Sequence, residues 1–282
     1  MDAVVDGMGI CDRGTVKAAC PLEGGAVNSG STCGVVSGGC LGIAMAHADD
    51  LASDETETVA VMYDKLLDYT GWFEREFGST LCRERAGVEL TRVPGFMNYI
   101  FTGKVFTRCV RHIGPAAEYG VELASRPLAA GESRGAVGNY CAAPVLRGIR
   151  EDTGHGNELL EAISIALDGG IGLSGGLCGA LAGALLPIGS LRGVNPRDGV
   201  WATLAPYIEG YLNMYFGRER AELWSTGGRL VRGFRKRFGS LDCRDITGRS
   251  FEGVDDLAAY MTESQVCAQI KDWCRREASN LL

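Results

Sequence analysis

The stretch SGGLCGALAG, residues 174–183, has a near-copy far upstream in SGSTCGVVSG, residues 29–38. In both stretches a glycine-rich loop leads into a cysteine, and a run of small residues follows it. Self-similarity within one chain indicates that one structural unit occurs more than once. With Cys33 placed on Cys178, two more similar stretches fall in the same order.

Three cysteines of each half pair in this alignment. The pairs are Cys33 with Cys178, Cys82 with Cys243, and Cys109 with Cys267. The second pair also shares its context, FGSTLC in one half and FGSLDC in the other. Chance does not give three ordered matches of this kind. We therefore expect two tandem copies of one unit, residues 1–130 and 131–282, with extra chain in the second copy around residues 191–217.

The pattern between the cysteines predicts helices. Apolar residues recur every three or four positions from Val59 to Phe77, as on one face of a helix, and a counterpart ends at Phe238. Gly78 and Gly239 follow as stop signals. No stretch alternates long enough to demand a strand. The expected fold class is all-α, with two helical bundles related by an internal pseudo-twofold axis.

Glycines are spaced four apart after each repeated cysteine, at Gly34 and Gly38 and again at Gly179 and Gly183. Glycine within a helix costs about 1 kcal/mol relative to alanine. Keeping such glycines on one face in both halves indicates that another part of the chain packs very close to each helix.

Composition and charge argue against nucleic-acid-binding, secreted and membrane-spanning proteins. The net charge is −7 and the arginines are dispersed, which argues against a nucleic-acid partner. The N-terminus lacks the basic and apolar regions of a secretory signal. The apolar stretch at residues 171–188 is rich in glycine, contains a proline and lacks aromatic belts, so a buried helix is favoured over a membrane span. We expect a cytoplasmic protein.

Eleven cysteines are unusual for such a chain. In a reducing compartment they indicate metal ligands or redox thiols rather than structural disulfides. Only three histidines are present, and none lies in a haem-attachment motif. Cys40 and Cys274 are expected to be small buried hydrophobic residues.

The second half contains a set of four cysteines that each begin or flank a predicted helix. They are Cys141, Cys178, Cys243 and Cys267. Four converging thiolates would satisfy an iron–sulfur cluster or a tetrahedral Zn²⁺. Cys178 and Cys33 each open a helix, where free N–H groups favour a thiolate and lower its pKa.

The first half supplies three equivalents, Cys33, Cys82 and Cys109, and lacks the helix that carries Cys141. Cys20 is the expected fourth member, because it aligns with Ile165, near the end of the helix that returns beside Cys141. Pro21 favours an extended chain that turns toward the following loop. Cys11 is the alternative, roughly 13 Å away along a helix. Without either residue, one coordination position stays open.

These cysteine motifs resemble the C_GCAxxG_C_C family, which is named for its pattern and described as redox-active. The second half matches all four cysteines, with CGALAG at its centre, and the first half matches the last three, with CGVVSG. A similar unit occurs in split-Soret cytochrome c proteins, which combine haem with an iron–sulfur centre. Because this chain has no haem-attachment motif, the resemblance implies the iron–sulfur part alone.

The leading hypothesis is an electron-transfer protein that holds one or two iron–sulfur clusters, 2Fe–2S or 4Fe–4S, and meets a redox partner protein. A metal-free thiol–disulfide oxidoreductase with Cys178 as its low-pKa thiol is one alternative, and a Zn-stabilised structural module is another. A homodimer and an enzymatic activity are both left open. Arg83 and Arg244, after the third cysteine of each pattern, either neutralise cluster charge or pair with Glu84 and Asp245.

Overall fold

The computed structural model describes residues 1–52, 56–90, 93–128, 138–199 and 222–282, together with the single residues 201, 205 and 209. Within these residues the chain forms fifteen α-helices, short 3₁₀ and π turns, and no strand. The predicted all-α class is confirmed. The boundary predicted near residue 130 and most of the extra chain predicted around residues 191–217 lie outside the described residues.

The helices of the first half are α1 (Asp2–Gly7), α2 (Arg13–Ala18), η1 (Cys20–Leu22), α3 (Gly34–Ala46), α4 (Ala48–Ala52), α5 (Thr56–Phe77), α6 (Cys82–Ala86), α7 (Val93–Phe101), η2 (Val105–Cys109), η3 (Val110–His112) and α8 (Ile113–Ser125). Those of the second half are α9 (Ala142–Thr153), α10 (Glu158–Ile163), η4 (Ser164–Leu167), α11 (Gly179–Arg192), η5 (Pro196–Asp198), α13 (Glu222–Phe238), α14 (Cys243–Thr247), α15 (Val254–Glu263) and α16 (Gln265–Ser279).

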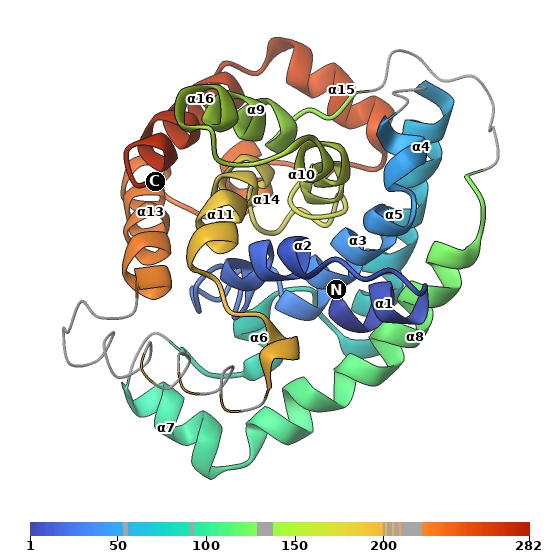
Figure 1. Ribbon diagram of the computed structural model, residues 1–282. Helices are drawn as coiled ribbons and strands as arrows, with labels where there is room; N and C mark the ends of the chain where they lie inside the picture. Colours follow the sequence, from blue (N-terminus) through green and yellow to red (C-terminus); the bar gives the residue numbers. More distant parts are fainter. Residues whose placement is uncertain are drawn as a thin grey trace.

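One hydrophobic core joins the two halves. Helices α3 and α11 run through it, and helices such as α5, α8, α13 and α16 lie toward the outside (Figure 1). Every residue of α11 from Gly179 to Gly189 is buried, and so is every residue of α3 from Val36 to Met45. The two helices that follow the repeated cysteines are therefore the centre of the fold.

The long apolar stretch at residues 171–188 contributes its second part to α11 and is buried inside this core, as expected. Among the helices that the structure describes, none has the length and apolar character needed to cross a bilayer. Cys40 and Cys274 are fully buried in the core, as predicted for small hydrophobic residues.

The glycines of α3 and α11 allow close packing, as predicted. A Cβ on Gly183 would lie 2.8 Å from the Cβ of Ala142 in α9. A Cβ on Gly39 would lie 2.0 Å from the hydroxyl oxygen of Tyr69 in α5, and one on Gly38 only 2.7 Å from the amino nitrogen of Met1. Neighbouring segments thus occupy the space that larger side chains would need.

The loop before each repeated cysteine winds in the left-handed sense. Positive φ angles occur at Gly24, Gly25, Ala26, Val27, Asn28 and Gly30 in the first loop, and at Gly169, Gly170, Ile171, Gly172, Leu173 and Gly175 in the second. A branched side chain in this region of backbone space costs about 1–3 kcal/mol. Val27 and Ile171 adopt it nonetheless, so surrounding contacts must hold the loops in this shape.

Backbone hydrogen bonds recur at matched positions of the two loops. In the first loop, the N–H groups of Gly30 and Ser31 donate to the carbonyl oxygens of Gly24 and Gly25, both at 3.0 Å. In the second loop, the N–H groups of Gly175 and Gly176 donate to the carbonyl oxygens of Gly169 and Gly170, also both at 3.0 Å. A Cβ on Gly170 would lie 2.7 Å from the carbonyl carbon of Gly175 and 2.8 Å from the Cβ of Cys243. Glycine is therefore required where this loop closes on itself.

A single antiparallel bridge then joins each loop to the segment before the next cysteine, Thr32 to Leu81 and Leu177 to Asp242. In the first bridge, Cys33 N–H donates to Thr80 O (2.8 Å) and Cys82 N–H donates to Ser31 O (2.7 Å). In the second bridge, Cys178 N–H donates to Leu241 O (2.8 Å) and Cys243 N–H donates to Gly176 O (2.6 Å). Each bridge holds two cysteines of the pattern side by side.

Replacing Gly183 with alanine is expected to lower the free energy of unfolding by about 1–3 kcal/mol, because the added methyl group overlaps Ala142. Gly114 in α8 is the matched control, since nothing lies within 4 Å of its added Cβ. Gly114→Ala should raise stability by up to about 1 kcal/mol through helix propensity alone. Chemical denaturation followed by circular dichroism at 222 nm measures both. Equal effects of the two substitutions would contradict the close packing.

Candidate functional site

The four cysteines of the second half come from four separate elements and line one pocket. Cys141 and Cys178 are the N-caps of α9 and α11, Cys243 is the first residue of α14, and Cys267 lies in the first turn of α16. The rest of the pocket is mostly apolar, with Ile246, Phe251, Leu257, Met261 and Ile270 in its wall and Lys271 at its side. The tertiary structure thus brings together the predicted set.

Asp168 positions the first of these cysteines. Its buried carboxylate accepts hydrogen bonds from the backbone N–H groups of Tyr140 (2.6 Å), Cys141 (3.0 Å) and Ala142 (3.3 Å), and from the hydroxyl of Tyr63 in α5 (2.7 Å). A carboxylate at this place caps the helix and stabilises its N-terminus. Cys141 is held at the pocket by this cap.

Burial dominates the protonation of these thiols. It raises the pKa of Cys178 to about 11, although the N–H groups of Leu181 and Ala180 at the start of α11 lower it by a smaller amount. Burial also raises the pKa of Cys33, against the N–H groups of Val35 and Val36. The predicted fall of the thiol pKa at these helix starts is therefore wrong, because loss of solvation outweighs the helix N-terminus.

The remaining members of the second set are also protonated in the metal-free chain. Burial raises the pKa of Cys243, and the charges of Cys178 and Cys267 add to the effect. Burial raises the pKa of Cys141, and the charge of Asp168 adds a smaller effect in the same direction. Such thiols ionise when a bound cation replaces their protons.

The first half brings three cysteines together. Cys33 is the N-cap of α3, Cys82 begins α6, and Cys109 ends η2. The first bridge holds Cys33 beside Cys82, and Cys109 packs against the small cluster that contains Cys82. Burial raises the pKa of Cys82, and the charges of Cys33 and Cys109 add to the effect. Tyr99 of α7 lies with them and hydrogen-bonds to Cys109. Arg85 is close enough for its charge to lower the pKa of Cys33.

The two candidates for a fourth residue in the first half lie at different places. Cys11 is exposed, and Arg197 donates a hydrogen bond to its sulfur at 3.7 Å. Cys20 begins η1, and its Cβ lies 3.2 Å from where a Cβ on Gly193 would be, just beyond the end of α11. Cys20 as the fourth ligand stays a prediction.

Arg83 and Arg244 have partners other than those predicted for them. Arg83 forms an ion pair with the buried carboxylate of Asp242, with 2.7 Å between Nη1 and Oδ2. Arg244 donates to the carbonyl oxygens of Ser174 (2.9 Å) and Gly175 (3.3 Å). Arg85 and Lys271 are instead the basic residues that lie beside the cysteines.

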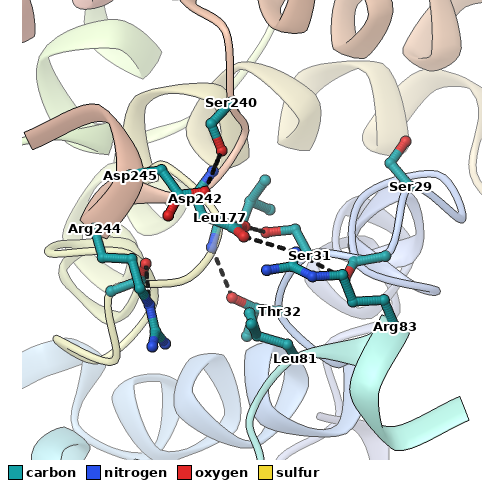
Figure 2. Close-up of polar contacts among 12 residues, drawn as sticks. Ser29, Ser31, Thr32, Leu81, Arg83, Leu177, Ser240, Asp242, Arg244 and Asp245 are labelled. Carbon is teal, nitrogen blue, oxygen red and sulfur yellow. Dashed lines mark hydrogen bonds and ion pairs between the residues drawn. The ribbon is translucent and has the colours of Figure 1, made fainter. Parts of the chain in front are cut away.

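Buried polar contacts around Asp242 join the segments that follow the two cysteine loops (Figure 2). Asp242 accepts a hydrogen bond from Ser31 after the first loop, and the N–H of Leu177 after the second loop donates to Thr32 Oγ1 at 2.7 Å. Each of these residues is within two positions of a cysteine of the pattern. The two cysteine sites therefore share one buried polar contact region.

A family model described as "Putative redox-active protein (C_GCAxxG_C_C)" matches residues 1–123 and residues 139–278. The two segments together span most of the chain. The chain belongs to the C_GCAxxG_C_C family. The resemblance found in the sequence is confirmed. No curated protein and no solved structure matches the chain.

Sequence reasoning missed two residues that lie at the sites in this C_GCAxxG_C_C protein, Asp168 and Tyr99. For Asp168 a signal was present, since a carboxylate precedes a Gly-Gly pair at the start of each loop, Glu23 in EGG of the first and Asp168 in DGG of the second. Tyr99 has no such signal, because α7 approaches the cysteines only in the folded chain.

Replacing Asp242 with asparagine is expected to lower the free energy of unfolding by about 1–3 kcal/mol, because it removes a buried charge-assisted contact between the segments that follow the two loops. Asp272, which pairs with Arg276 at the surface, is the matched control. Asp272→Asn should change stability by less than about 0.5 kcal/mol. Thermal unfolding of both variants measures the difference, and an Asp242→Asn protein as stable as the wild type would contradict a structural role for this contact.

Proposed function

We propose that this C_GCAxxG_C_C protein is an electron-transfer protein that holds an iron–sulfur cluster, of the 2Fe–2S or 4Fe–4S type, at the four-cysteine pocket of its second half. A bound cluster supplies reversible one-electron chemistry, and the thiolates of Cys141, Cys178, Cys243 and Cys267 would hold it. The three cysteines of the first half form the core of a second site of the same kind.

The observation that carries the proposal is the convergence of four thiols on one apolar pocket. Soft thiolate donors select iron–sulfur clusters, Zn²⁺ and Cu⁺ over hard cations. The pocket has four such donors from elements that are far apart in the chain, and a wall made mostly of apolar side chains. An apolar wall excludes water and tunes the reduction potential of a cluster.

A single Zn²⁺ ion, with bonds of about 2.3 Å to its sulfurs, is the other occupant that four thiols can hold. In the described part of the chain, no three Cys, His, Asp or Glu side chains are arranged as ligands of one ion. Metal analysis of the reconstituted protein distinguishes the two occupants.

The protonation of the thiols argues against the metal-free oxidoreductase. That mechanism needs a thiolate near neutral pH, whereas the pKa of Cys178 is about 11 because the residue is buried. Cluster assembly does not need a preformed thiolate, since iron binding itself displaces the protons.

We further propose that the two segments matched by the family model are tandem copies of one unit, related by a pseudo-twofold axis. The recurring left-handed loops, the paired bridges and the ordered cysteines support this relation. A chain with two such sites can pass electrons between them. Cys109 and Cys267, which are partly exposed, bring one edge of each site toward the surface, where a redox partner protein can dock.

Serine substitution of any one second-set cysteine is expected to remove most of the iron bound in the second half. The protein is purified and reconstituted without oxygen, and iron, acid-labile sulfide, the visible spectrum and the electron paramagnetic resonance (EPR) spectrum of the reduced form are measured. Cys40→Ala is the matched control, because Cys40 is a buried cysteine of the core that belongs to neither set.

The wild type should be brown, and each single variant should lose one of two cluster signals while Cys40→Ala keeps both. A reconstituted wild type that binds Zn²⁺ and no iron would favour the structural module. Full iron content and an unchanged spectrum in all four serine variants would overturn the assignment of these ligands.

A further inference from the structure

Glu23 and Asp168 occupy the same place in the two halves. Each directly precedes the left-handed loop, and the backbone carbonyl of each accepts a matching hydrogen bond, from Asn28 N–H at 3.3 Å and from Leu173 N–H at 3.1 Å. Each also lies against the first residue of the central helix. A Cβ on Gly34 would lie 3.1 Å from Glu23 Cα, and a Cβ on Gly179 would lie 2.4 Å from the carbonyl oxygen of Leu167, next to Asp168.

The two carboxylates differ in what they bind. Asp168 accepts four hydrogen bonds, three of them from the backbone at the start of α9, and so holds Cys141 at the second site. In the first half no Cys141 equivalent is among the described cysteines that meet at the site. Glu23 therefore occupies the position of Asp168, but it does not bind the start of a helix that carries a fourth cysteine.

The Glu23 carboxylate is buried and incompletely satisfied. Its Oε1 atom has no hydrogen-bond partner among the residues that the structure describes. Burial raises the pKa of this carboxyl to about 8, although the Asn28 side chain lowers it by a smaller amount. A buried polar atom without a partner costs about 1–3 kcal/mol, so a native protein keeps one where a ligand or ion completes it.

Glu23 lies close to the cysteines of the first site. Gly34 directly follows Cys33, and a Cβ on Gly34 would lie 3.1 Å from Glu23 Cα. Glu23 is also among the groups whose charge raises the pKa of Cys82. The extra methylene of glutamate, relative to Asp168, lengthens the reach of the carboxylate by one bond. One unpartnered carboxylate oxygen thus lies in the same region as the three thiols, at the start of α3.

We infer that Glu23, in place of the predicted Cys20, is the fourth ligand of the first site, which then binds its iron–sulfur cluster through three thiolates and one carboxylate, in contrast to the four thiolates of the second site. This inference rests on the proposed function. A carboxylate oxygen is a harder donor than a thiolate and suits the iron of a cluster less well. The iron beside Glu23 is accordingly the one that exchanges its ligand most readily, and a small anionic or neutral molecule can replace the carboxylate there.

The experiment compares Glu23→Gln, Glu23→Cys and Cys20→Ala with the wild type after anaerobic reconstitution. Iron and sulfide content and the EPR spectrum of the reduced protein are measured for the loaded chain, and thermal unfolding is measured for the metal-free chain. Glu23→Gln should lose iron and the signal of the first cluster while keeping that of the second. Glu23→Cys should keep both clusters and shift the first signal toward that of the second. Cys20→Ala should resemble the wild type.

The measurements separate this inference from the proposed function. Two outcomes would overturn the assignment of Glu23 while the chain remains an iron–sulfur protein with two clusters. In the first, Glu23→Gln leaves both cluster signals unchanged. In the second, Cys20→Ala removes the signal of the first cluster. A wild type without iron at either site overturns both the inference and the proposed function. Metal-free Glu23→Gln should be about as stable as the metal-free wild type, because burial raises the pKa of Glu23 to about 8 and the amide is close in size to the neutral carboxyl that it replaces. A marked loss of that stability would assign Glu23 a structural role and overturn the inference.

Discussion

The left-handed backbone of residues 24–28 and 169–173 is the constraint on which the two cysteine sites depend. Five consecutive residues with positive φ cannot be accommodated by most sequences, and the glycines at Gly25 and Gly170 are enclosed by the atoms that close each loop. Each loop closes on itself through its own backbone hydrogen bonds. The cysteine that follows it is the N-cap of a buried central helix. The bridge after the turn then places the next cysteine of the pattern beside the first.

Buried polar contacts connect this local geometry to the rest of the fold. Asp168 ties the left-handed loop of the second half to the start of α9 and, through Tyr63, to α5 of the first half. Asp242, which pairs with Leu177 after the second loop, binds Ser31 after the first loop and Arg83 of α6 (Figure 2). Each of these carboxylates is buried and hydrogen-bonded. A different arrangement of the segments that it joins would leave a buried carboxylate without partners, so these contacts favour one arrangement.

The cysteines themselves illustrate a competition between two electrostatic effects. The first turns of α3 and α11 point N–H groups at Cys33 and Cys178, which favours the thiolate. The apolar surroundings favour the neutral thiol and win in the metal-free chain. An environment of this kind keeps thiols unreactive until a cation arrives, and it suits a ligand set better than a nucleophile.

The sequence by itself determined the helical class, the central place of the two small-residue helices and the family, because these follow from apolar periodicity, glycine spacing and the ordered cysteines. It also identified the four cysteines that line the second pocket. Only the tertiary structure decided the partners of Arg83 and Arg244, the raised pKa values of Cys33 and Cys178, and the placement of Glu23, Asp168 and Tyr99. The physical reason is that solvation and side-chain pairing depend on which distant segments meet, whereas periodicity and backbone preference act between near neighbours in the chain.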